Sequence, residues 1–162
     1  MTFPQDIAVD FAAVAALAGI PIAVSEIEIV ELPAPHRRPS SLPKGKLAVY
    51  VFVYGDSCLK VGKAGQRSKA RYCSHHYGMN APSTLAKSLL KNQNRIGVSN
   101  INDANVGEWI CQNTRRINFL LPASYGIFLL SLLEAFVQCH LKPVFEGFDS
   151  QRSITQSTLY AA

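Results

Sequence analysis

Four residues of this 162-residue chain have side chains that suit the hydrolysis of a phosphate ester: Tyr50, Lys60, Arg71 and Glu134. Glu134 is the most informative, because it is the one acid in a long apolar stretch. A carboxylate there is costly to bury unless it has a partner or a metal ion. Lys60 also interrupts an apolar segment, whereas Tyr50 or Arg71 taken alone is an ordinary core tyrosine or surface charge.

Phosphodiester hydrolysis needs a proton acceptor for the attacking water and positive charge for the transition state. It also needs help for the leaving 3′-oxygen. A divalent ion on Glu134 would stabilise that oxygen. A single carboxylate leaves most of the coordination shell to water and phosphate, which suits Mg²⁺ or Mn²⁺. The planar guanidinium of Arg71 can clamp a phosphate through two parallel hydrogen bonds.

The proton acceptor has two candidates. Tyr50 accepts a proton only as phenolate, and the pKa of a free tyrosine is about 10. An ammonium such as Lys60 nearby would favour the phenolate and lower that pKa. Alternatively, Lys60 is itself the base, if burial depresses its own pKa. The sequence leaves both roles open.

The order and spacing of these residues resemble the GIY-YIG nuclease family. Val49-Tyr50-Val51-Phe52 is similar to the first motif, with Ala48 in place of its glycine. Lys60-Val61-Gly62 is similar to the second motif, and its lysine in place of the second tyrosine resembles some small restriction endonucleases of the family. The segment Arg71-Tyr72-Cys73-Ser74-His75 resembles the arginine-plus-histidine helix of these enzymes.

The resemblance covers about Leu47 to Gly147. It implies a metal-dependent DNA endonuclease with Tyr50, Lys60, Arg71, His75 and Glu134 as catalytic residues and Glu134 as the metal ligand. An asparagine common after the C-terminal proline of the family is replaced in Pro143-Val144-Phe145-Glu146, which leaves the role of Glu146 open.

Charge is segregated along the chain. Residues 1–36 hold five acids and no Lys or Arg, residues 37–95 hold twelve Lys or Arg against one acid, and the remainder has a net charge of −1, within an overall +5. Such a basic block indicates a polyanionic partner, here DNA. The candidates for contacts to the DNA backbone are Lys63, Arg67, Lys69, Lys87, Lys91, Arg115 and Arg116.

Residue periodicity predicts the elements that must position the site. Helices are expected over Asp6–Leu17, Arg67–Tyr77, Ser83–Lys91, Asp103–Cys111 and Tyr125–Leu141, with Ser83 and Asp103 as caps. Strands are expected over Leu47–Tyr54, Cys58–Val61 and Thr114–Leu121, and Ile22–Leu32 fits either type. Gly62–Gly65 is expected to end the second strand, which places Lys63 in a turn.

These elements predict an α+β fold with a small three-stranded, mostly antiparallel sheet flanked by helices. Residues 1–45 would be an N-terminal extension with a helix, an acidic segment and a Pro-rich linker. Residues 46–148 would be the GIY-YIG-like nuclease domain, and residues 149–162 a C-terminal tail. The extension is too acidic to grip DNA, so we expect it to cover the sheet or to form a dimer contact.

Several classes are excluded or disfavoured. The start of the chain lacks the positive segment of a secretory signal, and the run Tyr125–Leu133 is too short to span a bilayer, so a cytoplasmic protein is expected. The four cysteines lack zinc-site spacing.

Three functions remain. The first is a Mg²⁺-dependent endonuclease of restriction type, for which cutting both strands implies a homodimer. The second is a catalytically inactive nucleic-acid-binding module of the same fold. The third is a structural or repair-partner role without hydrolysis.

Overall fold

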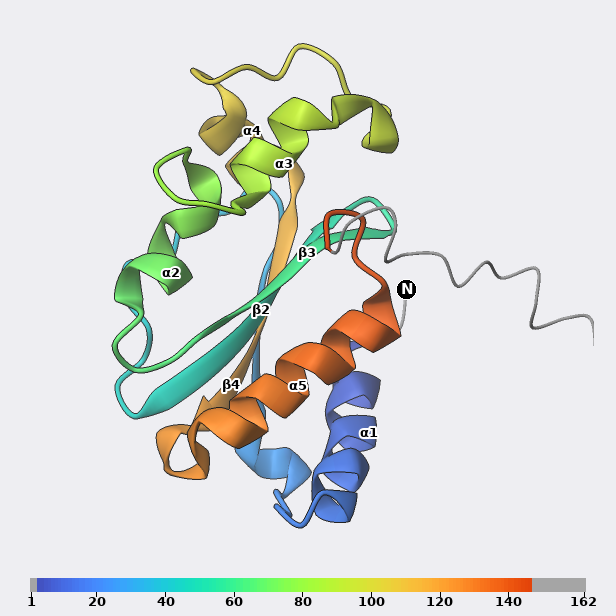
Figure 1. Ribbon diagram of the computed structural model, residues 1–162, viewed down its shortest axis with the longest axis vertical. Coiled ribbons are helices and arrows are strands. Elements are labelled where there is room, and N and C mark those ends of the chain that lie inside the picture. Colours follow the sequence, from blue (N-terminus) through green and yellow to red (C-terminus); the bar gives the residue numbers. More distant parts are fainter. Residues whose placement is uncertain (1–2, 147–162) are drawn as a thin grey trace, which may run out of the picture.

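The computed structural model describes residues 3–146, which form one four-stranded antiparallel sheet between two layers of helices (Figure 1). The strands are β1 (Glu28–Leu32), β2 (Lys46–Tyr54), β3 (Ser57–Ala64) and β4 (Arg115–Pro122), in the order β1-β4-β2-β3. The helices are α1 (Pro4–Leu17), α2 (Lys69–Cys73), α3 (Leu85–Lys91), α4 (Val106–Asn113) and α5 (Gly126–Leu141). The α+β class is confirmed.

Alternation along β2 explains why both faces of the sheet are covered. Leu47, Val49 and Val51 share one core with α1 and α5. The intervening Ala48, Tyr50 and Phe52 share a second core with residues of α3, α4 and Tyr72 of α2. Successive side chains of a strand point to opposite faces, so an unbroken apolar strand needs a layer on each side. Figure 1 shows α1 and α5 together on one side.

The ambiguous segment Ile22–Leu32 contains strand β1, which pairs with β4 through Glu28↔Leu120 to Leu32↔Arg116. The sheet therefore has four strands instead of the expected three. Residues 1–45 contribute α1 and β1 to the same folded unit as the remainder of the described chain. Helix α1 covers the sheet beside α5. Covering the sheet was one of the two roles expected for the acidic N-terminal extension.

Four local predictions are wrong. Strand β3 runs through Gly62 to Ala64, so the strand does not end at Gly62. The basic segment is not one helix, because α2 ends at Cys73 and a 3₁₀ turn, His75–Tyr77, follows. The cap of α3 is Thr84, whose hydroxyl accepts from the Lys87 N–H, and not Ser83.

The fourth wrong prediction is the cap of α4. The N-cap residue of α4 is Asn105, not Asp103, and its side chain makes no capping hydrogen bond to the helix. The turn before α4 is held instead by Asn102, whose side-chain oxygen accepts from the backbone N–H of Ala104 at 2.9 Å. An asparagine side chain can stabilise a turn in the same way as an aspartate.

One stretch of the described chain, Ala123–Leu141 with 19 residues, is long and apolar enough by length and composition alone to cross a membrane. In the fold it packs against the sheet through Leu129, Leu130, Leu133 and Val137. Its one acid forms an ion pair with Lys63 of β3. Only 22% of this stretch is buried, and Ile127 and Phe128 near its start are exposed. The predicted C-terminal tail, 149–162, lies outside the described residues.

Candidate active site

A pocket of about 100 Å³ opens at the free edge of the sheet, where β3 lies between the two helical layers. It collects side chains from both faces of the sheet because, within residues 3–146, β3 is the last strand of the sheet. Its lining residues are Tyr50, Lys60, Val61, Gly62, Arg71, His76, Ser83, Glu134, Gln138 and Glu146. Tyr50, Lys60, Arg71 and Glu134, which come from β2, β3, α2 and α5, are thus brought together.

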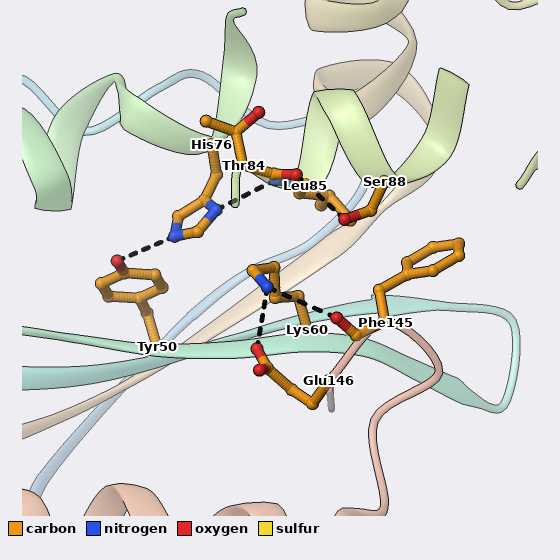
Figure 2. A network of polar contacts seen from close by, with 8 residues as sticks. All are labelled: Tyr50, Lys60, His76, Thr84, Leu85, Ser88, Phe145 and Glu146. Carbon is orange, nitrogen blue, oxygen red and sulfur yellow. Dashed lines mark hydrogen bonds and ion pairs between the residues drawn. The ribbon is translucent and has the colours of Figure 1, made fainter. Parts of the chain in front are cut away.

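Tyr50 lies on β2, and its side chain is fully buried. Its hydroxyl lies 3.0 Å from Nε2 of His76, while Nδ1 of His76 accepts the backbone N–H of Leu85 at 3.1 Å (Figure 2). Because Nδ1 is an acceptor, the neutral ring carries its proton on Nε2 and donates it to Tyr50. Burial lowers the pKa of His76 to about 2, so the ring stays neutral.

Gly62 fits Tyr50 for a steric reason. A Cβ at position 62 would lie 2.7–2.9 Å from three atoms of the Tyr50 side chain. The two residues are cross-strand partners in the β2–β3 register. Only glycine lets the phenol ring cross β3 to reach the pocket.

The pKa of Tyr50 is raised, chiefly by burial, and the charge of Glu134 adds to the rise. Arg116 and Arg71 oppose the shift through their charges. The expectation that Lys60 lowers this pKa below its usual value is wrong in direction. A phenol in this setting keeps its proton at neutral pH.

Lys60 is engaged elsewhere. Its ammonium lies 2.9 Å from a carboxylate oxygen of Glu146 and donates to the backbone oxygen of Phe145 at 3.5 Å (Figure 2). The lysine side chain is 5% exposed and that of Glu146 is 27% exposed, so the ion pair is partly buried. The segment after α5 follows β3 through two backbone hydrogen bonds, Val144 N–H to Cys58 O and Phe145 N–H to Leu59 O. Glu146 therefore has a role that the sequence left open: it holds Lys60.

Glu134 lines the pocket from α5, and its side chain is 21% exposed. Its partner is Lys63, whose Nζ lies 2.7 Å from Oε2 of Glu134. The partly buried acid is thus balanced by a cation of the protein. The carboxylates of Glu134 and Glu146 both line the pocket, and such hard oxygen donors fit Mg²⁺. Within residues 3–146 no group of three or more His, Cys, Asp or Glu side chains could hold a metal ion, so water and phosphate would complete the shell.

The histidine of the site is His76, whereas the sequence pointed to His75. The prediction placed Arg71 and His75 four residues apart on one helix. Because α2 ends at Cys73, the 3₁₀ turn changes the phase, and His76 faces the pocket. His75 is half-buried outside the lining, with its ring centroid 5.0 Å from that of His76.

The predicted DNA-backbone contacts divide into three groups. Arg67, Lys69 and Lys91 are exposed and Lys87 is half-buried. Arg115 pairs with Glu31 at 3.3 Å, and Lys63 lies on β3 and pairs with Glu134. Arg116 is 1% exposed, so its prediction as a surface contact is wrong.

Arg116 is a buried cation behind the pocket. Its guanidinium donates to the Tyr72 carbonyl at 2.8 Å and to the Asn118 side chain at 2.9 Å. It lies over the rings of Tyr50 and Tyr72, at 4.8 and 4.6 Å from their centroids. Neutral acceptors and aromatic faces stabilise this charge. The sequence gives no signal of it, since Arg115 and Arg116 differ only in which face of β4 they occupy.

Comparison with family models, curated proteins and solved structures finds no match for this chain.

Proposed function

We propose that the protein is a metal-dependent endonuclease that hydrolyses DNA phosphodiester bonds, with a GIY-YIG-like active site in the pocket at the edge of β3. The observation that carries the proposal is the convergence of Tyr50, Lys60, Arg71 and Glu134, from four separate elements, on one pocket. A structural core has no need for a phenol, two cations and a carboxylate around one opening.

Each side chain has a role that follows from its place. Arg71 is exposed at the rim, where its guanidinium can bind the scissile phosphate through two hydrogen bonds. Tyr50 is the proposed proton acceptor, because its hydroxyl reaches the pocket while His76 donates to its oxygen. That donated hydrogen bond favours the phenolate once a proton leaves. Lys60, held by Glu146, lines the pocket and could donate hydrogen bonds to the phosphate.

Glu134 would hold the divalent ion, Mg²⁺ or Mn²⁺. When bound there, such an ion supplies Lewis-acid stabilisation of the leaving 3′-oxygen. The exposed cations Arg67, Lys69 and Lys91 would contact the DNA backbone on either side of the scissile bond.

The most specific version is a restriction-type enzyme. One such pocket cuts one strand, so cleavage of both strands would need two protomers. The free cysteines at positions 58, 73, 111 and 139 suit a reducing compartment such as the cytoplasm.

The alternative is a catalytically inactive nucleic-acid-binding module of the same fold. Three observations favour it: Glu134 and Lys60 are both occupied by ion pairs, and the pKa of Tyr50 is raised. An inactive module keeps the basic surface and has no requirement for a free carboxylate.

The test is incubation of the full chain with supercoiled plasmid, single-stranded DNA and RNA, each with Mg²⁺ or with EDTA. The endonuclease proposal expects nicked or linear plasmid with Mg²⁺ alone. Mapping the cut ends then distinguishes a fixed sequence from structure-directed cleavage. Plasmid that is bound but stays intact at every Mg²⁺ concentration would support the inactive module instead.

A further inference from the structure

The carboxylate best placed to hold a metal ion is already occupied by a cation of the protein. Nζ of Lys63 lies 2.7 Å from Oε2 of Glu134 and donates to the hydroxyl of Ser131 at 3.2 Å. The two charged side chains are 30% and 21% exposed. Partial burial weakens solvent screening, so this pair is stronger than a fully exposed one.

The contact is built by two elements. Lys63 stands opposite Val49 in the β2–β3 register, so its side chain faces the α5 layer. Ser131 and Glu134 lie three residues apart on α5 and therefore project from the same side of the helix. The ammonium is fixed by two oxygens that one helix presents together.

Lys60 provides an internal comparison. It belongs to the same strand and lines the same pocket, but it stands opposite Phe52 and faces the other layer. Its partner is Glu146 at 2.9 Å. Both glutamates line the pocket, and each is paired with a lysine of β3, but only the Lys63 pair involves the proposed metal ligand.

We propose that Lys63 is a positioning residue that acts as an internal counter-ion of Glu134, which a divalent ion must displace in order to bind. This inference rests on the proposed function, because it concerns the metal site of that function. A neutral Lys63–Glu134 pair attracts a dication far less than a bare carboxylate does. The pair therefore keeps the affinity for metal low, and displacement by the ion leaves the Lys63 ammonium available to a phosphate in the pocket.

The experiment is a titration of the full chain with Mn²⁺ in the absence of DNA, in which EPR measures the free ion. Lys63→Met removes the ammonium and keeps an apolar stem of similar length. We expect it to bind Mn²⁺ about tenfold more tightly than wild type, which equals about 1.4 kcal/mol of competing interaction. Lys63→Gln, which keeps a polar side chain at the partly exposed position, is expected to shift the affinity in the same direction.

Lys46→Met is the matched control, because it removes the same charge from an ion pair outside the pocket, Lys46–Glu28, and leaves the Lys63–Glu134 pair intact. Its effect should stay within about threefold, the contribution of screened charge alone. The double variant Lys63→Met/Glu134→Gln should lose the gain. Equal Mn²⁺ affinity in wild type and Lys63→Met, including no measurable binding in either, would overturn the proposal, as would an equal gain in Lys46→Met.

The result is independent of cleavage. A gain in Mn²⁺ affinity without DNA hydrolysis would uphold the displacement and reject the nuclease. Hydrolysis by wild type with unchanged Mn²⁺ affinity in Lys63→Met would uphold the nuclease and reject the displacement.

Discussion

Tyr50 is buried, and its side chain lines the pocket. His76 donates to the hydroxyl at 3.0 Å, Gly62 leaves room for the ring, and the guanidinium of Arg116 lies over its face. These contacts hold the phenol in one position at the pocket. A general base must be held within hydrogen-bond reach of its proton donor, and this arrangement satisfies that geometric condition.

Tyr50→Phe is expected to reduce single-turnover cleavage by at least about a hundredfold, the usual contribution of a general base. DNA binding should be unchanged, since the ring remains. Tyr54→Phe, on the same strand but outside the pocket, is the control and should cut like wild type. Tyr50→Phe with full activity would mean that the phenol has no part in the chemistry.

The pH dependence follows from the same residue. Because the pKa of Tyr50 is raised, the phenolate fraction grows throughout the neutral and mildly alkaline range. The single-turnover rate of wild type should therefore rise with pH from 7 to about 9 without levelling off. A rate that levels off near pH 7 would assign the proton transfer to another group.

Arg71→Ala should lower the single-turnover rate by about a hundredfold or more, since a phosphate clamp strengthens as charge develops in the transition state. Arg67→Ala is the matched variant, an exposed arginine four residues earlier and outside the pocket lining. It should weaken DNA binding and flatten its salt dependence, with the bound complex cutting at the normal rate. Equal effects of both variants on affinity, with normal rates in both, would make Arg71 an ordinary backbone contact.

At the scale of elements, strands β2 and β3 bring the two motifs together. Cross-strand pairing places Tyr50 opposite Gly62 and Phe52 opposite Lys60. The hairpin thereby sends Tyr50 and Lys60 to the same face and Lys63 to the other. Because β3 is at the edge of the sheet, side chains from both faces of the sheet can line one pocket.

Gly62→Ala is expected to destabilise the fold by about 1–3 kcal/mol, because its Cβ would overlap the Tyr50 ring and force the ring or the strand to move. Gly65→Ala is the control, since a Cβ there meets no atom within 4 Å. Urea denaturation of the two variants measures the difference. Equal stability of the two would show that the ring does not depend on the glycine.

The sequence predicted the hairpin, β4 and α5 because apolar runs bounded by turn residues mark such elements clearly. It left β1 undecided, since Ile27 and Ile29 alternate with acids as in a strand, while Ser25 and Glu28 also match a helix start. It missed the break in the basic helix, which replaced His75 with His76 in the site. No local pattern predicts that break, because packing decides which residue of a short turn faces the sheet. His76 is held by hydrogen bonds with Tyr50, which is distant in the sequence, and with Leu85, which comes after the turn.

The sequence also could not predict which charged residues form ion pairs. The cost of burying Glu134 correctly indicated a partner, but Lys63 lies 71 positions away in the numbering and was expected in a turn. Glu146 and Arg116 gave no signal, because contacts between side chains of different elements depend on register and on which face each residue occupies.

At the scale of the whole molecule, buried neutral histidines make stability depend on pH. The pKa of His36 and that of His76 are both lowered by burial, the latter to about 2. The unfolded chain, with histidine pKa values near 6.5, then binds more protons than the folded one below that pH. This contribution to stability is complete above about pH 6.5 and is lost as the pH falls.

We expect the free energy of unfolding to fall by about 2 kcal/mol between pH 6.5 and pH 5 from His76 alone. Urea denaturation at several pH values gives the slope, and His76→Gln should make it shallower. A stability that stays constant down to pH 5 would be incompatible with a neutral, buried His76.

The central claim is that Glu134 carries the metal ion of a DNA-cutting site, and Glu134→Gln tests it most directly. The swap keeps size and hydrogen bonding but removes the charge that holds a cation. Glu108→Gln, at an exposed position of α4, is the control. Single-turnover cleavage of plasmid at saturating Mg²⁺ should be abolished in Glu134→Gln and normal in Glu108→Gln, with equal DNA binding in both. Wild-type turnover by Glu134→Gln at saturating Mg²⁺ would contradict the account.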